Sequence, residues 1–315
     1  MSEGGIVAGH RGDRLGHWTS PDAEREFTSL NDALRIEAAT ALREQGWSTP
    51  LHESDVETRY GLTHIFHYGG TGVPIVLLHG AGTTSLMWYP LLGGLIGRSI
   101  YAIDVVGDPG LSVQRAPIRD EVDLAEWLGE VLDALDLDRV NLVGASYGGW
   151  IALTYARRVP QRVAALILVE PVLDKLRGWF WIHGIAVAVA FAMPRPIARR
   201  ALRRLHMNTD LLEDKRVRRY GFLGLTRYRR GLPKPVPVTN TDLAAVSAPT
   251  LLLLGEHSEI HKSPILIARA RAAMPNVSAD LIAEAGHGLP VDKADEVARR
   301  IGSFLAADTG SQHED

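Results

Sequence analysis

The sequence predicts an α/β fold in which a mostly parallel central sheet carries helices on both faces and a helical cap interrupts the chain. Short, almost continuously apolar runs alternate with helix-type segments, and such runs are typical of parallel strands buried on both faces. The interval between residues 170 and 250 is far too long for a single crossover connection. Hydrophobic residues make up 46% of the 315 residues, which suits one large domain with an insertion.

The first 50 residues are expected to form a helical extension. Ser20 is a good N-cap, Pro21 suits a first helical turn and Gly46 is a stop signal, so residues 21–45 are predicted to be a helix on the outside of the main domain. Residues 52–59 and 63–68 then flank a Tyr-Gly turn and predict a β-hairpin.

The main domain is predicted to follow from the alternating pattern. Its five apolar runs, each expected to be a buried strand, are residues 73–79, 99–104, 140–145, 163–170 and 250–255. Helical periodicity marks residues 122–135, 150–159, 265–273 and 294–305. Strands that alternate with helices in this way form a doubly wound sheet.

The cap is expected to be helical and to cover residues 172–240, which leaves residues 51–171 and 241–315 as the core domain. Residues 197–205 show an apolar stripe between arginines. Trp179 and Trp181 are expected to line or cover an apolar pocket for an acyl or ring-bearing substrate.

Charge is unevenly distributed along the chain. The 34 Lys and Arg against 37 Asp and Glu give a net charge of −3, which argues against a nucleic-acid-binding protein. Residues 195–234 nevertheless contain 13 basic and three acidic residues, or +10, which leaves −13 for the remainder. We interpret this segment as a solvated face partly paired with the acidic core. The alternative is attraction of an anionic substrate group, an acidic carrier or a membrane surface.

Several classes of protein are excluded or disfavoured. Because the chain has no Cys, disulfides, iron–sulfur clusters, zinc–cysteine sites and a thiol nucleophile are excluded. No cofactor or metal is expected: His64 and His67 are three apart on a predicted strand and would face opposite sides. The first residues lack the apolar segment of a secretory signal, and the longest apolar run, residues 184–193, is shorter than the ~20 residues of a membrane span. A cytoplasmic location without a transmembrane segment is therefore expected.

The strongest functional motif is Gly-Ala-Ser-Tyr-Gly at residues 144–148, a G-x-S-x-G sequence between a predicted strand and a predicted helix. Such a tight turn exposes the serine hydroxyl, and the helix N-terminus favours developing negative charge beside it. The motif predicts that Ser146 is a nucleophile.

A second motif, His-Gly-Ala-Gly at residues 79–82, resembles the H-G-x-G loop of the α/β-hydrolase superfamily. The resemblance implies that the backbone N–H groups of Ala81 and Tyr147 form an oxyanion hole. It also places Gly80 and Gly82 beside the substrate. The side chain of His79 is expected only to order the loop.

Two further segments extend this resemblance over residues 73–305. His287 lies between two glycines after the last predicted strand, where the family places its catalytic base. Residues 104–112 resemble the family's D-x-x-G-x-G-x-S loop, with one extra residue between Gly107 and Gly110. This version looks like that of the carboxylesterase-like bacterial branch.

Four carboxylates are candidates for the acid that orients the histidine. At the position where the family usually has Asp, this chain has Ser258, and its neighbour Glu259 is the first candidate because the order Ser146, Glu259, His287 matches the family. The alternatives are Glu256, on the same loop, and Glu170 or Asp174, after the preceding strand.

These motifs together predict a serine hydrolase that cleaves a carboxylic ester or lactone with an apolar acyl or ring portion through an acyl-enzyme. One alternative is a lyase or cyclase that uses His287 and the oxyanion hole without an acyl-enzyme. The other is a non-catalytic binding protein, which the Ser258 position alone favours.

Overall fold

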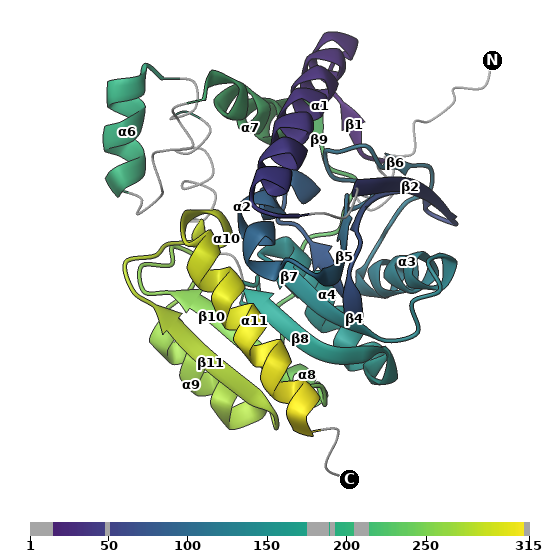
Figure 1. The fold of residues 1–315 in the computed structure, drawn as a ribbon, viewed down its shortest axis with the longest axis vertical. Coiled ribbons are helices and arrows are strands. Elements are labelled where there is room, and N and C mark those ends of the chain that lie inside the picture. The colour runs from purple at the N-terminus through teal and green to yellow at the C-terminus, as the bar shows by residue number, and fades with distance from the viewer. Residues whose placement is uncertain (1–14, 48–50, 175–188, 190–192, 205–213, 312–315) are drawn as a thin grey trace, which may run out of the picture.

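A computed structural model describes residues 15–47, 51–174, 189, 193–204 and 214–311 of the chain (Figure 1). Within these ranges it shows the α/β-hydrolase architecture, with a twisted central sheet between two layers of helices. Trp179 and Trp181 lie outside the described residues.

The central sheet is mostly parallel, as predicted. Its main strands lie in the order β11-β10-β8-β7-β4-β5-β3-β2, and only β2, β3 and the short β6, which pairs with β3, run antiparallel to their neighbours. The bounds are β2 Leu51–Thr58, β3 Gly61–Tyr68, β4 Thr71–Leu78, β5 Arg98–Ile103, β6 Val113–Gln114, β7 Val140–Ala145, β8 Val163–Val169, β10 Thr250–Gly255 and β11 Val277–Ile282.

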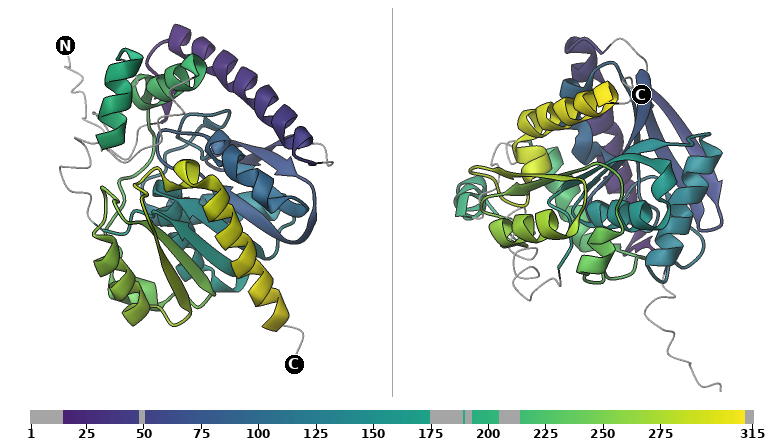
Figure 2. Two further views of the ribbon diagram at one scale, coloured as in Figure 1. Left: turned by 60° about the vertical axis from the view of Figure 1, so that its left-hand side comes forward. Right: turned by 90° about the horizontal axis from the view of Figure 1, so that it is seen from below.

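Both faces of the sheet are buried under helices (Figure 2). Along β4, Val76 and Leu78 pack into the cluster that contains Trp127 and Trp150, while Ile75 and the other alternate side chains pack against the opposite helices. Helices α3 (Glu121–Ala134), α4 (Tyr147–Arg158) and α9 (Ser263–Ala273) cover the first face, and α2 (Tyr89–Leu92) and α11 (Ala294–Ser311) cover the second. Burial on both faces explains why these strands are continuously apolar in sequence.

Each predicted strand and helix of the core domain has a counterpart in the structure, but besides several short elements one full-length strand of the main sheet was not predicted. The bounds of β7 and β10 agree with the predicted runs, and the hairpin is formed by β2 and β3. The omitted strand is β11, which is an edge strand where only Ala279 and Ile282 are buried. Because an edge strand keeps polar residues among its apolar ones, it lacks the continuous apolar run that marked the others.

The segment expected to form the cap, residues 172–240, contributes α6 (Arg195–Arg204) and α7 (Lys215–Arg227) to the described structure. Helix α1 (Pro21–Glu44), which begins at the N-cap Ser20, packs on α7 with its N-terminal half, where Phe27 stacks on Tyr220 at 4.5 Å between ring centroids. Its other end reaches the core through Leu42. The two-stranded pair of β1 (His17–Trp18) and β9 (Tyr228–Arg229) joins the N-terminal region to the end of the cap (Figure 1). The helix therefore contacts both α7 and the core, whereas the sequence suggested only that it covers the core.

Candidate active site

The candidate site lies at the carboxyl edge of the parallel strands. Ser146 follows β7, Glu170 follows β8, and His79 follows β4, so these residues come from neighbouring strands at one edge of the sheet. His287 lies in the loop after β11. Loops at this edge form the binding crevice of open α/β sheets.

Ser146 occupies the predicted sharp turn between β7 and α4. Its φ is 52°, a left-handed conformation that is uncommon for a residue with a side chain. The turn is tight enough that a Cβ on Gly148 would overlap the carbonyl oxygen of Leu78. The backbone carbonyl of Ser146 accepts from the N–H groups of Trp150 and Val172. The hydroxyl of Ser146 lies at the start of α4 and faces His287.

His287 bridges the serine and a carboxylate. Its Nε2 lies 3.1 Å from Oγ of Ser146, and its Nδ1 lies 3.2 Å from Oε2 of Glu170. A carboxylate at Nδ1 fixes the proton there and leaves Nε2 as an acceptor for the serine hydroxyl. The arrangement has the geometry of a nucleophile, a base and an orienting acid.

The carboxylate beside the imidazole ring is that of Glu170, which was one of the alternatives from the sequence. The first candidate was Glu259, and for the contact with the ring that prediction is wrong. Glu259 instead accepts a hydrogen bond from the backbone N–H of His287 at 2.9 Å. Asp174 is half exposed and pairs with Arg269. The carboxylate of Glu256 accepts from the N–H of Glu284. Of these four carboxylates, that of Glu170 is the one that lies within hydrogen-bond distance of the ring among the contacts of the described residues.

Glu170 is held by its surroundings. It is fully buried, and its φ of 48° departs from the strand conformation of the residues before it. The N–H of Gly255 donates to Oε1 at 2.6 Å, and the hydroxyl of Ser258 donates to Oε2 at 2.6 Å. Ser258, where the family usually has the acid, therefore supports the acid from the neighbouring strand. Sequence reasoning offered Glu170 as an alternative acid but missed the supporting role of Ser258.

The glycine-rich loop after β4 lies against the nucleophile. A Cβ added to Gly80 would lie 3.3 Å from Cβ of Ser146. The buried His79 orders the loop, as expected: the N–H of Val105 donates to Nε2 at 2.9 Å, so the proton is on Nδ1, which donates to the carbonyl of Gly80 at 2.9 Å. Within the described residues, the N–H groups of Ala81 and Tyr147 have no protein acceptor.

The N–H of Gly82, in contrast, has a protein acceptor, because it donates to Oδ1 of Asp108 at 3.1 Å. Its φ of +72° favours glycine, and its backbone packs against Leu225 of α7. Gly82 is therefore a packing point between the loop and the cap, and not a third free donor.

A second histidine lies beside this group. His261 Nε2 donates to the carbonyl of Pro171, the residue after Glu170, at 2.6 Å. Burial lowers the pKa of His261 despite the opposing effect of the nearby Glu170 carboxylate. The ring is therefore neutral at pH 7 and braces the segment that carries the acid.

Part of the basic cap is paired. Arg216 and Arg219 of α7 form ion pairs at 2.6 Å with the α1 carboxylates of Glu37 and Glu26. The hydrogen bond from Arg219 lowers the pKa of Glu26. Arg230 pairs with the buried Asp108. These contacts agree with the interpretation that cap cations neutralise acids elsewhere in the chain.

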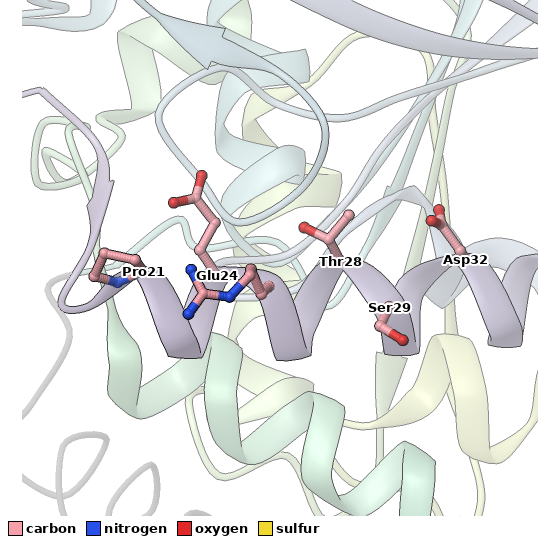
Figure 3. Close-up of a pocket in the computed structure, with 6 residues that line it drawn as sticks. Pro21, Glu24, Thr28, Ser29 and Asp32 are labelled. Atoms are coloured by element: carbon pink, nitrogen blue, oxygen red, sulfur yellow. The ribbon is translucent and has the colours of Figure 1, made fainter.

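Other kinds of site do not emerge from the described residues. No group of three or more His, Asp or Glu there is arranged to hold a metal ion, and no helix there is long and apolar enough to cross a bilayer. The hollow drawn in Figure 3 is lined by residues of the outer face of α1 alone and contains none of the candidate catalytic residues.

Comparisons with known proteins agree with the fold. Residues 75–300 match the sequence model of the alpha/beta hydrolase family. The chain is 27% identical over 302 residues to carboxylesterase YbfK of Bacillus subtilis (strain 168), covering 89% of this chain and 96% of that protein. It is 29% identical over 301 residues to the uncharacterized carboxylesterase nap of the same organism, covering 92% and 95%. The crystal structure of naproxen esterase from Bacillus subtilis is similar with a TM-score of 0.77 and 25% identity, covering 91% and 99% of the two chains.

Proposed function

This chain belongs to the alpha/beta hydrolase family, and from that premise we propose that it is a serine carboxylesterase that works through an acyl-enzyme. The observation that carries the proposal is the contact of His287 with Ser146 on one side and Glu170 on the other. The similarity to bacterial carboxylesterases over about nine-tenths of the chain supports an ester as the substrate.

In the proposed reaction, Oγ of Ser146 attacks the ester carbonyl while Nε2 of His287 takes the hydroxyl proton. The carboxylate of Glu170 stabilises the imidazolium that forms. His287 then gives the proton to the leaving alcohol, and the acyl group stays on Ser146. Water, deprotonated by the same histidine, attacks the acyl-enzyme, releases the acid and restores the serine.

The oxyanion of each tetrahedral intermediate is proposed to accept from the N–H groups of Ala81 and Tyr147. Both lack a protein acceptor within the described residues, and the loop that carries Ala81 touches the side of Ser146. Donors fixed before the reaction stabilise charge at little reorganisation cost, and removing one such donor costs about 100- to 1,000-fold in kcat.

We propose an apolar acyl or ring portion for the substrate. Two apolar side chains beside the oxyanion loop support this: Leu225 of α7, which is 41% exposed and contacts Gly82, and Met87, whose sulfur accepts from the N–H of Gly80. The aromatic cap sequence around Trp179 and Trp181 points to the same substrate class. A related protein of known structure is named a naproxen esterase.

The test combines one mutation with one probe. Ser146→Ala should abolish hydrolysis of p-nitrophenyl butyrate, because no other group supplies the nucleophile. A fluorophosphonate should label the wild-type protein once, at Ser146. Wild-type turnover by Ser146→Ala would reject the mechanism. Absence of labelling in a protein that still converts substrate would favour the lyase or cyclase route, in which no acyl-enzyme forms.

A further inference from the structure

We propose that Arg230 and Asp108 are positioning residues of the oxyanion hole, and that their ion pair couples the seating of the cap to the catalytic geometry. The inference rests on the proposed ester hydrolysis. Asp108 lies between Gly107 and Gly110, in the interval that is one residue longer than in the family pattern. The triad does not explain the role of this carboxylate.

The carboxylate of Asp108 joins the cap to the loop after β4. Asp108 is 1% exposed. Its Oδ1 accepts from Nε of Arg230 and from the N–H of Gly82, and its Oδ2 accepts from Nη2 of Arg230 at 2.8 Å. Such a two-pronged Arg–carboxylate pair fixes orientation as well as distance.

This contact controls the backbone at Ala81. The Ala81–Gly82 peptide is held at its N–H by Asp108. The preceding Gly80–Ala81 peptide is held at its carbonyl by Nδ1–H of His79 and by the hydroxyl of Thr83 at 2.7 Å. In a trans peptide the N–H points away from the carbonyl, so the Ala81 N–H is directed away from those anchors. Ala81 is thus anchored on both sides, and loss of the Asp108 contact would leave only the Gly80–Ala81 peptide held and would let the residue shift.

The other proposed donor residue is braced by the same cap segment. The guanidinium of Arg230 lies over the ring of Tyr147, 4.5 Å from its centroid. The hydroxyl of Tyr147 donates to the carbonyl of Pro233 at 2.8 Å. Arg230 thus contacts one donor residue directly and reaches the other through Asp108.

The chain around Arg230 is locked against the core. The N–H of Gly231 donates to the carbonyl of Gly107 at 3.0 Å. On α7, a Cβ on Gly224 would lie 2.7 Å from the carbonyl oxygen of Gly82, so helix and loop are in direct contact. The segment that closes the cap is therefore also the segment that holds the oxyanion loop, and displacing it would disturb catalysis before it disturbed the triad.

The test compares Arg230→Lys with Arg229→Lys, a matched change at the adjacent exposed arginine. Lysine keeps the charge near Asp108 but cannot form the two-pronged pair. We expect Arg230→Lys to lower kcat about 10- to 100-fold, as small misplacements in active sites do. KM should stay within about twofold, because the lost interaction belongs to the transition state. Arg229→Lys should keep the wild-type kcat.

A second readout separates positioning from stability. A boronic acid forms a tetrahedral adduct with a reactive serine, and its oxygen occupies the oxyanion hole. Calorimetry with butylboronic acid should show affinity falling in Arg230→Lys by the same factor as kcat/KM. Asp108→Asn, with folding followed by circular dichroism, gives the same comparison if Arg230→Lys is too unstable. A folded variant of either kind with wild-type kcat and boronate affinity would overturn the inference. A wild-type protein that neither cleaves esters nor binds the boronate would overturn the proposed function instead.

Discussion

Replacement of Glu170 by Gln is the sharpest test of the triad, because the buried surroundings dictate how the amide must sit. The N–H of Gly255 donates to Oε1 at 2.6 Å, so the amide oxygen must take that place, or two buried donors would face each other. The NH2 group then lies 3.2 Å from Nδ1 of His287. Facing a donor, Nδ1 must give up its proton, and the proton moves to Nε2. In that tautomer the ring cannot accept from Ser146.

The expected loss follows from this tautomer change. The same substitution of the orienting acid in a serine protease lowers kcat about 10,000-fold, so we expect a fall of about 1,000- to 10,000-fold, or about 4 to 5.5 kcal/mol in activation free energy. The assay is hydrolysis of p-nitrophenyl butyrate at pH 8, with folding checked by circular dichroism. Glu259→Gln is the matched control, since Gln keeps an acceptor for the His287 N–H, and it should stay near the wild-type rate.

A double variant tests whether a carboxylate from the neighbouring loop can replace that of Glu170. Oγ of Ser258 lies 2.6 Å from Oε2 of Glu170, so an aspartate at 258 would bring a carboxylate within reach of the histidine. We expect Glu170→Gln/Ser258→Asp to recover at least about tenfold of the lost kcat, as an acid restored to the ring should. Glu170→Gln with nearly wild-type kcat, combined with a collapse in Glu259→Gln, would refute the reasoning and return the role to Glu259.

Three other outcomes are expected. Gly148→Ala should lower the free energy of unfolding by about 1–3 kcal/mol or more, measured in urea, because its Cβ would overlap the Leu78 carbonyl; a neutral change would mean that the turn is not tight. Because burial lowers the pKa of His261, the unfolded chain takes up a proton first as pH falls below about 6.5. Stability should therefore be lost as pH falls through about 6.5, and His261→Gln should flatten that loss; identical slopes would contradict the burial effect. With Arg216 and Arg219 already paired to α1 carboxylates, kcat/KM for an ester that carries an anionic group should change little from low to moderate salt, and a steep fall would support electrostatic steering instead.

The fold and the proposed nucleophile could be predicted because their signals are local in sequence. A strand buried on both faces must be apolar throughout, so β7 and β10 were visible as runs with correct ends. The turn at Ser146 needs small neighbours on both sides, and the five consecutive residues 144–148 contain them. His287 was found through its flanking glycines and its place after the last strand.

The acid and the cap contacts could not be predicted in the same way. Glu170 and Glu259 both follow strands and both lie near His287, and they differ only in whether a side chain reaches the ring or the backbone of that residue. That choice depends on the left-handed backbone at Glu170 and on donors from Gly255 and Ser258, which are distant in sequence. Sequence alone determined the chemistry that we propose for this protein. Only the tertiary structure decided which carboxylate contacts the histidine and that Arg230 reaches both proposed oxyanion donor residues, because the backbone direction of distant segments sets those distances.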